Sequence, residues 1–119
     1  MRATYIIAAI AIPIGFILSC ETDKVGEQNQ ECPTTVSFST QIQPLIQTNC
    51  STSGCHATPG PGKPALNTHA EISANASQIR NVIRKNPGEP NFMPLGGQKL
   101  ADSLIQEFGC WIEQGLQDN

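Results

Sequence analysis

Residues 49–56 read NCSTSGCH, and the interpretation of the whole chain depends on this stretch. Cys50 and Cys55 are separated by four residues, and His56 follows the second cysteine directly. The usual signature of covalent haem attachment is C-x-x-C-H, in which the histidine beside the second cysteine can reach the iron. The four residues between the cysteines are small and favour turns, so the longer spacer can bulge outward. The stretch therefore favours a haem site of the variant form C-x4-C-H.

The first nineteen residues differ in composition from the rest of the chain. Arg2 supplies one positive charge, and residues 5–18 form an almost unbroken apolar run that is shorter than the roughly 20 residues of a membrane span. These features are typical of a secretory signal peptide. The sequence ILSC at residues 17–20 also resembles a bacterial lipobox. We expect residues 1–19 to be removed and Cys20 to be lipidated, which predicts an exported lipoprotein anchored to a bacterial membrane, in the periplasm or at the cell surface. The alternative is ordinary cleavage with Cys20 incidental.

The chain that remains after cleavage is acidic. Without Arg2 it has six Lys and Arg against ten Asp and Glu, a net charge of −4. Nucleic-acid binding favours concentrated basic surfaces, so we expect no nucleic-acid partner. Four of the acidic residues lie within residues 21–31, ETDKVGEQNQE, which has almost no apolar content. Such a composition predicts a flexible tether, which we assign to residues 20–35.

Apolar residues recur with helical spacing in three segments, and no segment alternates as a strand would. The first segment covers residues 34–48 and contains Pro44, so we expect a kink there or a helix that begins properly near Gln43. The second covers about residues 68–85, and the third covers residues 102–117. Helices therefore dominate the predicted fold.

The second segment begins with a capping box, in which Thr68 is the N-cap and Glu71 follows three residues later. A break near Asn75 is possible within it. The connections between the helical segments are rich in Gly and Pro and must be loops. Residues 36–119 are therefore expected to form one all-α domain with long loops. The hydrophobic core of a domain of 80-odd residues provides barely enough stability for folding. The size of the domain therefore favours an additional covalent cross-link or a prosthetic group.

The five cysteines can all be assigned a role. Export places them in an oxidising compartment, where an odd count needs an explanation. If Cys20 carries lipid and the pair within NCSTSGCH carries haem, Cys32 and Cys110 remain. They flank the domain, and we expect them to form a disulfide that fastens the N-terminal arm to the last helix. The alternative is a local disulfide between Cys50 and Cys55 that leaves the adjacent histidine without a role.

Met93 is the only methionine that remains after cleavage. It lies in a loop segment, NFMP, where its side chain can be presented to a planar group. Haem iron bound by histidine often takes methionine sulfur on its other side. A methionine that only fills the core is the alternative. Beside NCSTSGCH, Met93 is the predicted sixth ligand.

The chain resembles the single-haem c-type cytochrome domains of class I, especially those of bacterial exported lipoproteins. The resemblance covers about residues 36–117. It rests on FSTQIQPLI at residues 38–46, CH at 55–56, KPAL at 63–66, MPLGG at 93–97, Leu100 and WIEQG at 111–115. It implies three to five helices wrapped around one covalent haem c. It also implies thioethers at Cys50 and Cys55, axial ligands His56 and Met93, and a carbonyl of Pro64 that accepts the other imidazole N–H. The four-residue spacer between the cysteines departs from the two-residue spacing of the family pattern.

The predicted function is electron transfer to or from a redox partner protein, without enzymatic activity, because both axial positions of the iron would be filled. Two alternatives remain open. Cys50, Cys55, His56 and His69 together supply ligand types that zinc accepts, which would make a structural zinc module. A haem domain in which Met93 leaves the iron would instead bind a small gas or act as a weak peroxidase.

Overall fold

The computed structural model describes residues 31, 32 and 34–119. This part of the chain contains four α-helices: α1 (Gln43–Asn49), α2 (His69–Ala74), α3 (Ala76–Ile83) and α4 (Asp102–Glu113). A π-helical turn, Phe38–Ile42, runs directly into α1. The described residues contain no strand, and none of their helices is long and apolar enough to cross a membrane. The all-α prediction is confirmed. The predicted signal peptide, Cys20 and most of the predicted tether lie outside the described residues.

The first helical segment begins later than the apolar spacing predicted. Ser37 is extended (φ −89°, ψ 130°) and caps the helix by accepting a hydrogen bond from the backbone N–H of Thr40, and residues 34–37 are not helical. Pro44 lies in the first turn of α1, directly after the π-helical turn, and its missing N–H removes one donor where the π-helical hydrogen-bond pattern gives way to the α-helical one. The expectation that the regular helix starts near Gln43 is therefore confirmed.

The capping box at the start of α2 is present with both of its hydrogen bonds. The Thr68 hydroxyl accepts from the backbone N–H of Glu71, and the Glu71 carboxylate accepts from the backbone N–H of Thr68. Hydrogen bonds from the backbone N–H groups of Asn67 and Thr68 lower the pKa of Glu71, because they stabilise its charged form. Asn75 then separates α2 from α3, and its side-chain amide donates to the carbonyl oxygen of Glu71 at 2.8 Å. The possible break near Asn75 is thus confirmed.

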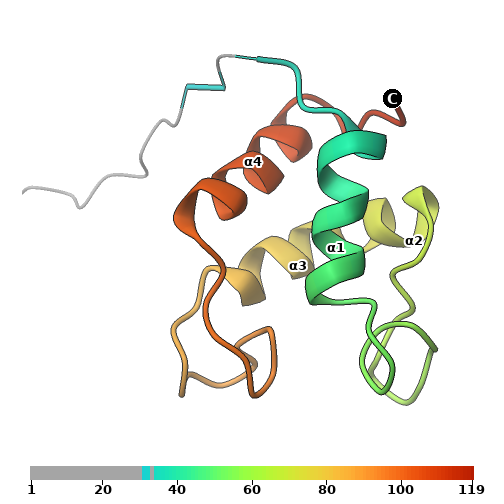
Figure 1. Ribbon diagram of the computed structural model, residues 1–119, viewed down its shortest axis with the longest axis vertical. Helices are drawn as coiled ribbons and strands as arrows, with labels where there is room; N and C mark the ends of the chain where they lie inside the picture. Colours follow the sequence, from blue (N-terminus) through green and yellow to red (C-terminus); the bar gives the residue numbers. More distant parts are fainter. Residues whose placement is uncertain (1–30, 33) are drawn as a thin grey trace, which may run out of the picture.

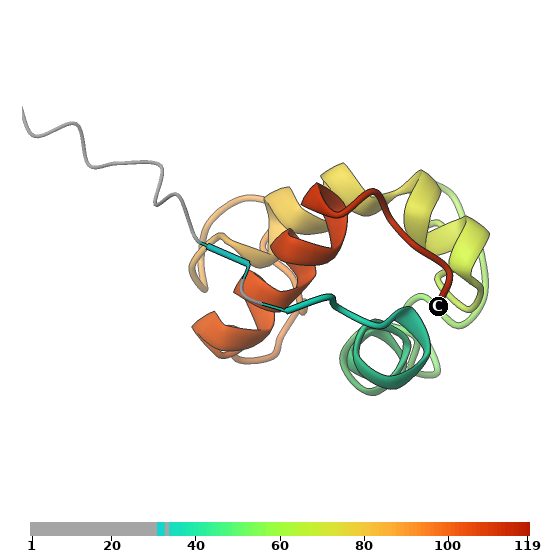
Figure 2. The ribbon, with the colours of Figure 1, turned by 90° about the horizontal axis from the view of Figure 1, so that it is seen from above.

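The helix α4 supplies the largest buried side chains. Phe108 and Trp111 are fully buried, and Trp111 lies 5.7 Å from the ring of Phe38. Figures 1 and 2 show α1, α3 and α4 around this core. The helix ends at Glu113, four residues before the predicted end, because Gly115 (φ 93°) and Leu116 (φ 57°) turn the chain back. The other buried apolar residues are Val36, Ile42, Leu45, Ile46, Leu66, Ile72, Ala76, Ile79, Ile83, Phe92 and Leu100.

The N-terminal arm is held against the end of α4. A disulfide joins Cys32 to Cys110, with 5.5 Å between their Cα atoms. The side-chain amide of Gln114 accepts from the N–H of Val36 and donates to the carbonyl oxygen of Thr34, both at 2.8 Å. In Figure 1 the arm and the C-terminus lie at one end of the molecule, whereas the two long loops lie together at the other end, below α1. The fold therefore separates the described arm and the C-terminus from the loops that contain the predicted site.

Candidate functional site

The segment from Cys50 to His56 forms a closed turn at the end of α1. The backbone N–H of Cys50 donates to Ile46 at 2.8 Å, and the N–H of His56 donates back to the carbonyl oxygen of Cys50 at 3.0 Å. Thr52, Ser53 and Gly54 are exposed. Gly54 has φ +82°, and no atom would lie within 4 Å of a Cβ added to it. The longer spacer therefore bulges into open space, while the turn returns His56 to the first cysteine.

The imidazole of His56 is oriented by the loop that follows it. Its Nδ1 lies 2.7 Å from the carbonyl oxygen of Pro64. A carbonyl only accepts, so Nδ1 carries the hydrogen and Nε2 presents its lone pair. Nε2 has no hydrogen-bond partner among the described residues. The half-buried imidazole therefore has one nitrogen committed to the protein and one available as a ligand.

The loop that carries Pro64 folds back on the same turn. The backbone N–H of Leu66 donates to the carbonyl oxygen of His56 at 3.0 Å, and the hydroxyl of Ser51 donates to the carbonyl oxygen of Leu66. Gly60 and Lys63 exchange two backbone hydrogen bonds of 2.8 and 2.9 Å, which close the tip of the loop. Ser51 has a positioning role that the sequence did not indicate, since its hydroxyl looked only like part of a small-residue spacer.

The two cysteines of the turn are free thiols in different environments. Cys50 is buried and Cys55 is exposed. Burial, and to a smaller extent electrostatic repulsion from the neighbouring Cys55, raises the pKa of the Cys50 thiol to about 11. The structure thus pairs Cys32 with Cys110 and contains no local disulfide between the cysteines of NCSTSGCH. The alternative hypothesis, a local disulfide between Cys50 and Cys55, is therefore wrong for this structure.

Met93 lies in the other long loop, between α3 and α4. Its backbone N–H donates to the carbonyl oxygen of Val82 at 3.2 Å, which holds this part of the loop against α3. The adjacent Phe92 is buried, whereas Met93 is only half-buried. The residue that fills space here is therefore Phe92. The anchoring role of Val82 had no signal in the sequence, because the hydrogen bond joins two backbone groups.

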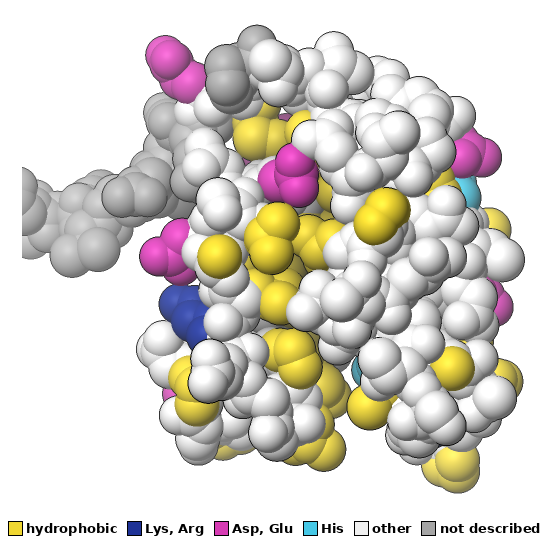
Figure 3. Space-filling model, viewed as in Figure 1, with side chains coloured by type: hydrophobic (Ala, Val, Ile, Leu, Met, Phe, Trp, Pro, Cys, Tyr) yellow, Lys and Arg dark blue, Asp and Glu magenta, His cyan; other side chains and the backbone are white. Residues whose placement is uncertain are grey.

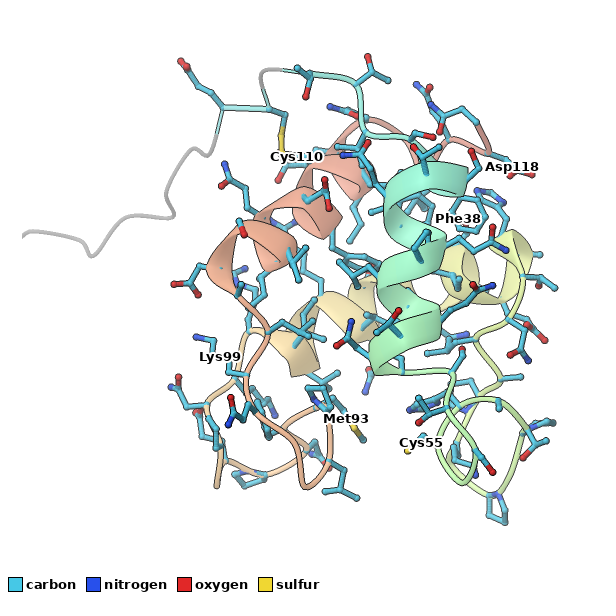
Figure 4. All side chains as sticks on the ribbon, in the orientation of Figure 1. Phe38, Cys55, Met93, Lys99, Cys110 and Asp118 are labelled. Carbon is cyan, nitrogen blue, oxygen red and sulfur yellow. A yellow bond between two sulfur atoms is a disulfide. The ribbon has the colours of Figure 1, made fainter. Side chains whose placement is uncertain are left out.

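The two loops face each other at the end of α1. In Figure 4 the sulfur-bearing ends of Met93 and Cys55 point toward one another from opposite loops. Figure 3 shows the surface hollowed at this end of the molecule, with apolar side chains on both sides of the hollow. The sequence-predicted residues of the turn, Pro64 and Met93 thus belong to one end of the fold.

His69 belongs to a different part of the molecule. Its Nε2 donates to the carbonyl oxygen of Leu116 at 2.8 Å, and its ring packs edge-on against Phe38 and Trp111 at 4.7 and 5.9 Å. Within the part of the chain that the structure describes, no three His, Cys, Asp or Glu residues gather closely enough to hold a metal ion. The four-ligand zinc site proposed with His69 is therefore not formed.

The donor set fits a covalent haem better than any other group that the sequence suggested. It consists of two thiols on one closed turn, an imidazole with a free Nε2 beside them, and a thioether on the facing loop. A zinc site would need a further nitrogen, sulfur or oxygen ligand that the described residues do not bring to this turn.

Comparisons of the chain with protein-family models, curated proteins and solved structures found no match. The resemblance to class I cytochromes c therefore rests on the residues of this chain alone.

Proposed function

We propose that this protein is an electron-transfer cytochrome of the class I c type that carries one covalent haem c. Cys50 and Cys55 form the two thioethers, and His56 and Met93 are the axial ligands. The observation that supports this proposal most strongly is the 2.7 Å contact between His56 Nδ1 and the carbonyl oxygen of Pro64. It leaves Nε2 free on a turn that also holds two free thiols.

Each residue has a distinct task in this proposal. When bound, haem supplies a one-electron iron couple. The carbonyl of Pro64 fixes the plane and the tautomer of the imidazole, and the hydrogen bond makes the imidazole a stronger donor. The soft thioether of Met93 favours ferrous over ferric iron, which raises the reduction potential. With both axial positions filled there is no open site for a substrate, so the protein transfers electrons with a redox partner protein and is not an enzyme.

The spacer between the cysteines is compatible with two thioethers. The hydrogen bond from His56 N–H to the carbonyl oxygen of Cys50 closes the turn despite the additional residues. Thr52, Ser53 and Gly54 are exposed, so three of the four spacer residues lie outside the fold, and the Ser51 side chain contacts the loop that follows. Cys50 therefore serves as an attachment residue in this proposal, as Cys55 does.

Intact mass spectrometry tests the attachment. The exported protein should be red, and its mass should include one haem that remains after extraction with acidified organic solvent. Cys50→Ala should leave a spectrum of a haem with a single thioether. Cys50→Ala combined with Cys55→Ala is the matched control and should release its haem on extraction. A parent protein whose haem extracts freely, or that is colourless when produced in a host that attaches haem c, contradicts the proposal.

We further propose that Cys20 anchors the protein to the membrane. The described arm leaves the domain at the end opposite the two loops, so a tether attached there directs the candidate haem site away from its point of anchorage (Figure 1). Cys20→Ser should move the protein to the soluble fraction with its haem intact. Persistence of that variant in washed membranes contradicts the lipid anchor and leaves the haem proposal untouched.

A further inference from the structure

The outer face of α3 and the two residues that follow the helix form a continuous polar stripe. Ser77, Arg80, Asn81, Arg84 and Lys85 follow one another at intervals of three, one, three and one residues. Ser77, Arg80 and Asn81 lie on one face of α3, and Arg84 and Lys85 continue this face in the turn directly after the helix. The opposite face is apolar and is buried in the core through Ile79 and Ile83. Burial of the apolar face therefore leaves the stripe turned toward solvent.

The stripe forms one wall of a surface depression of about 480 Å³. The other wall comes from the turn that follows α3, which contributes Asn86 and Glu89. This turn is fixed internally, because the backbone N–H of Asn86 donates to the Glu89 carboxylate and the N–H of Glu89 donates to the carbonyl oxygen of Asn86. The volume lies within the roughly 300–1,000 Å³ of small-molecule sites. A hollow of this size, lined only by polar and charged residues, fits a small polar ligand.

The charge of the depression is opposite to that of the chain. The full chain has a net charge of −3, yet three of the five Lys and Arg in the described part line this hollow, against one carboxylate. Arg80 is already engaged with Glu113, at 3.1 Å. Lys85 uses one of its three ammonium hydrogens on the carbonyl oxygen of Pro90. Arg84 is exposed and has no hydrogen bond or ion pair with the described residues.

We propose that this depression binds a small phosphate-bearing anion. Arg84 supplies a planar fork of N–H donors that matches two phosphoryl oxygens, and Lys85 supplies a compact second charge. The hydroxyl of Ser77 and the amide of Asn81 add neutral donors from the preceding turns of the helix. These four donor side chains lie in succession along one wall of the depression, so they can serve the three or more oxygens of a phosphoryl group, whereas a carboxylate has only two.

Glu89 limits the affinity of the site. Its carboxylate lines the hollow and repels an anion, but it also accepts the hydrogen bond that fixes the turn. Glutamine can accept the same hydrogen bond through its amide oxygen without the charge. Glu89→Gln should therefore tighten anion binding while the turn is retained, whereas Arg84→Gln should weaken it.

Titration calorimetry of the purified exported protein with inorganic pyrophosphate tests the proposal. We expect saturable binding that Arg84→Gln weakens about tenfold, as loss of a charge-assisted bidentate contact should. Glu89→Gln should tighten it about threefold, by removal of one like charge near the ligand. Lys63→Gln removes the same charge from the other loop and is the matched control, so it should leave the binding constant within about twofold. Absence of saturable binding, or equal weakening by the Arg84 and Lys63 variants, overturns the proposal.

The phosphate could be free in solution or belong to a lipid headgroup. Vesicles of phosphatidylglycerol and of phosphatidylcholine, sedimented with the Cys20→Ser variant, separate the two sources. Sedimentation with phosphatidylglycerol alone that is lost in Arg84→Gln identifies a headgroup as the ligand. Pyrophosphate binding without vesicle binding identifies a free anion. The calorimetric test does not depend on haem, so its failure leaves the proposed electron-transfer function intact.

Discussion

Removal of the disulfide between Cys32 and Cys110 should destabilise the domain more than any single hydrogen bond in the arm. The cross-link joins residues 78 apart in the chain. On the chain-entropy model a loop of that length contributes about 4.5 kcal/mol to the free energy of unfolding at room temperature. Total stabilities of small domains are roughly 5–15 kcal/mol, so the loss would be a large part of the whole.

Two variants separate the contribution of the cross-link to stability from the contribution of the packing of the buried Cys110 sulfur. Cys32→Ala opens the disulfide and leaves the Cys110 side chain, which is buried, in its place in the core. Cys32→Ala combined with Cys110→Ala also removes that sulfur and adds a small cavity. We expect the single variant to lose about 4.5 kcal/mol and the double variant to lose about 1 kcal/mol more.

Urea unfolding, monitored by circular dichroism, measures the loss of unfolding free energy in the single and in the double variant. The denaturant dependence of the unfolding free energy should also rise in both variants, because an open chain exposes more surface when it unfolds. The arm should remain docked in the native state, since the Gln114 amide still joins Val36 and Thr34. A loss below about 1 kcal/mol for Cys32→Ala would refute the reasoning, provided that unreduced peptide mapping shows the cross-link in the parent.

The remaining predictions concern the candidate site. Met93→Ala should lower the reduction potential and allow cyanide or carbon monoxide to bind the iron readily, as seen in absorption spectra and redox titration. His69→Ala should leave the haem spectrum unchanged, because the His69 ring lies against Trp111 and the carbonyl of Leu116. If His69→Ala changes the spectrum and Met93→Ala does not, the two axial ligands are both histidines. In protein produced without haem, Cys55 should be alkylated before Cys50, which is buried and has a pKa raised to about 11. The Cys50 rate should rise as the pH rises toward that value, because only the thiolate reacts, and equal rates near neutral pH would contradict the assigned burial.

Several local features could be predicted because they depend on residues that are close in sequence. The capping box of Thr68 and Glu71 and the start of the regular helix at Gln43 involve contacts within one helical turn. The end of α4 was predicted four residues too late, because apolar spacing continues to Leu116. The helix ends before Leu116 because Gly115 adopts a left-handed conformation. The backbone N–H of Leu116 donates to the carbonyl oxygen of Trp111 at 3.0 Å.

The sequence by itself determined which groups are adjacent along the chain, and therefore that Cys55 and His56 lie on one turn. Only the tertiary structure decided which distant groups accompany them. His69 has the same ring as His56, yet packing of α2 against Phe38 and Trp111 places it elsewhere. Met93 comes from a separate loop, anchored through Val82 to α3. Caps and turns form from contacts within a few residues, whereas the position of a loop depends on how whole helices bury their apolar faces, which no short stretch of sequence specifies.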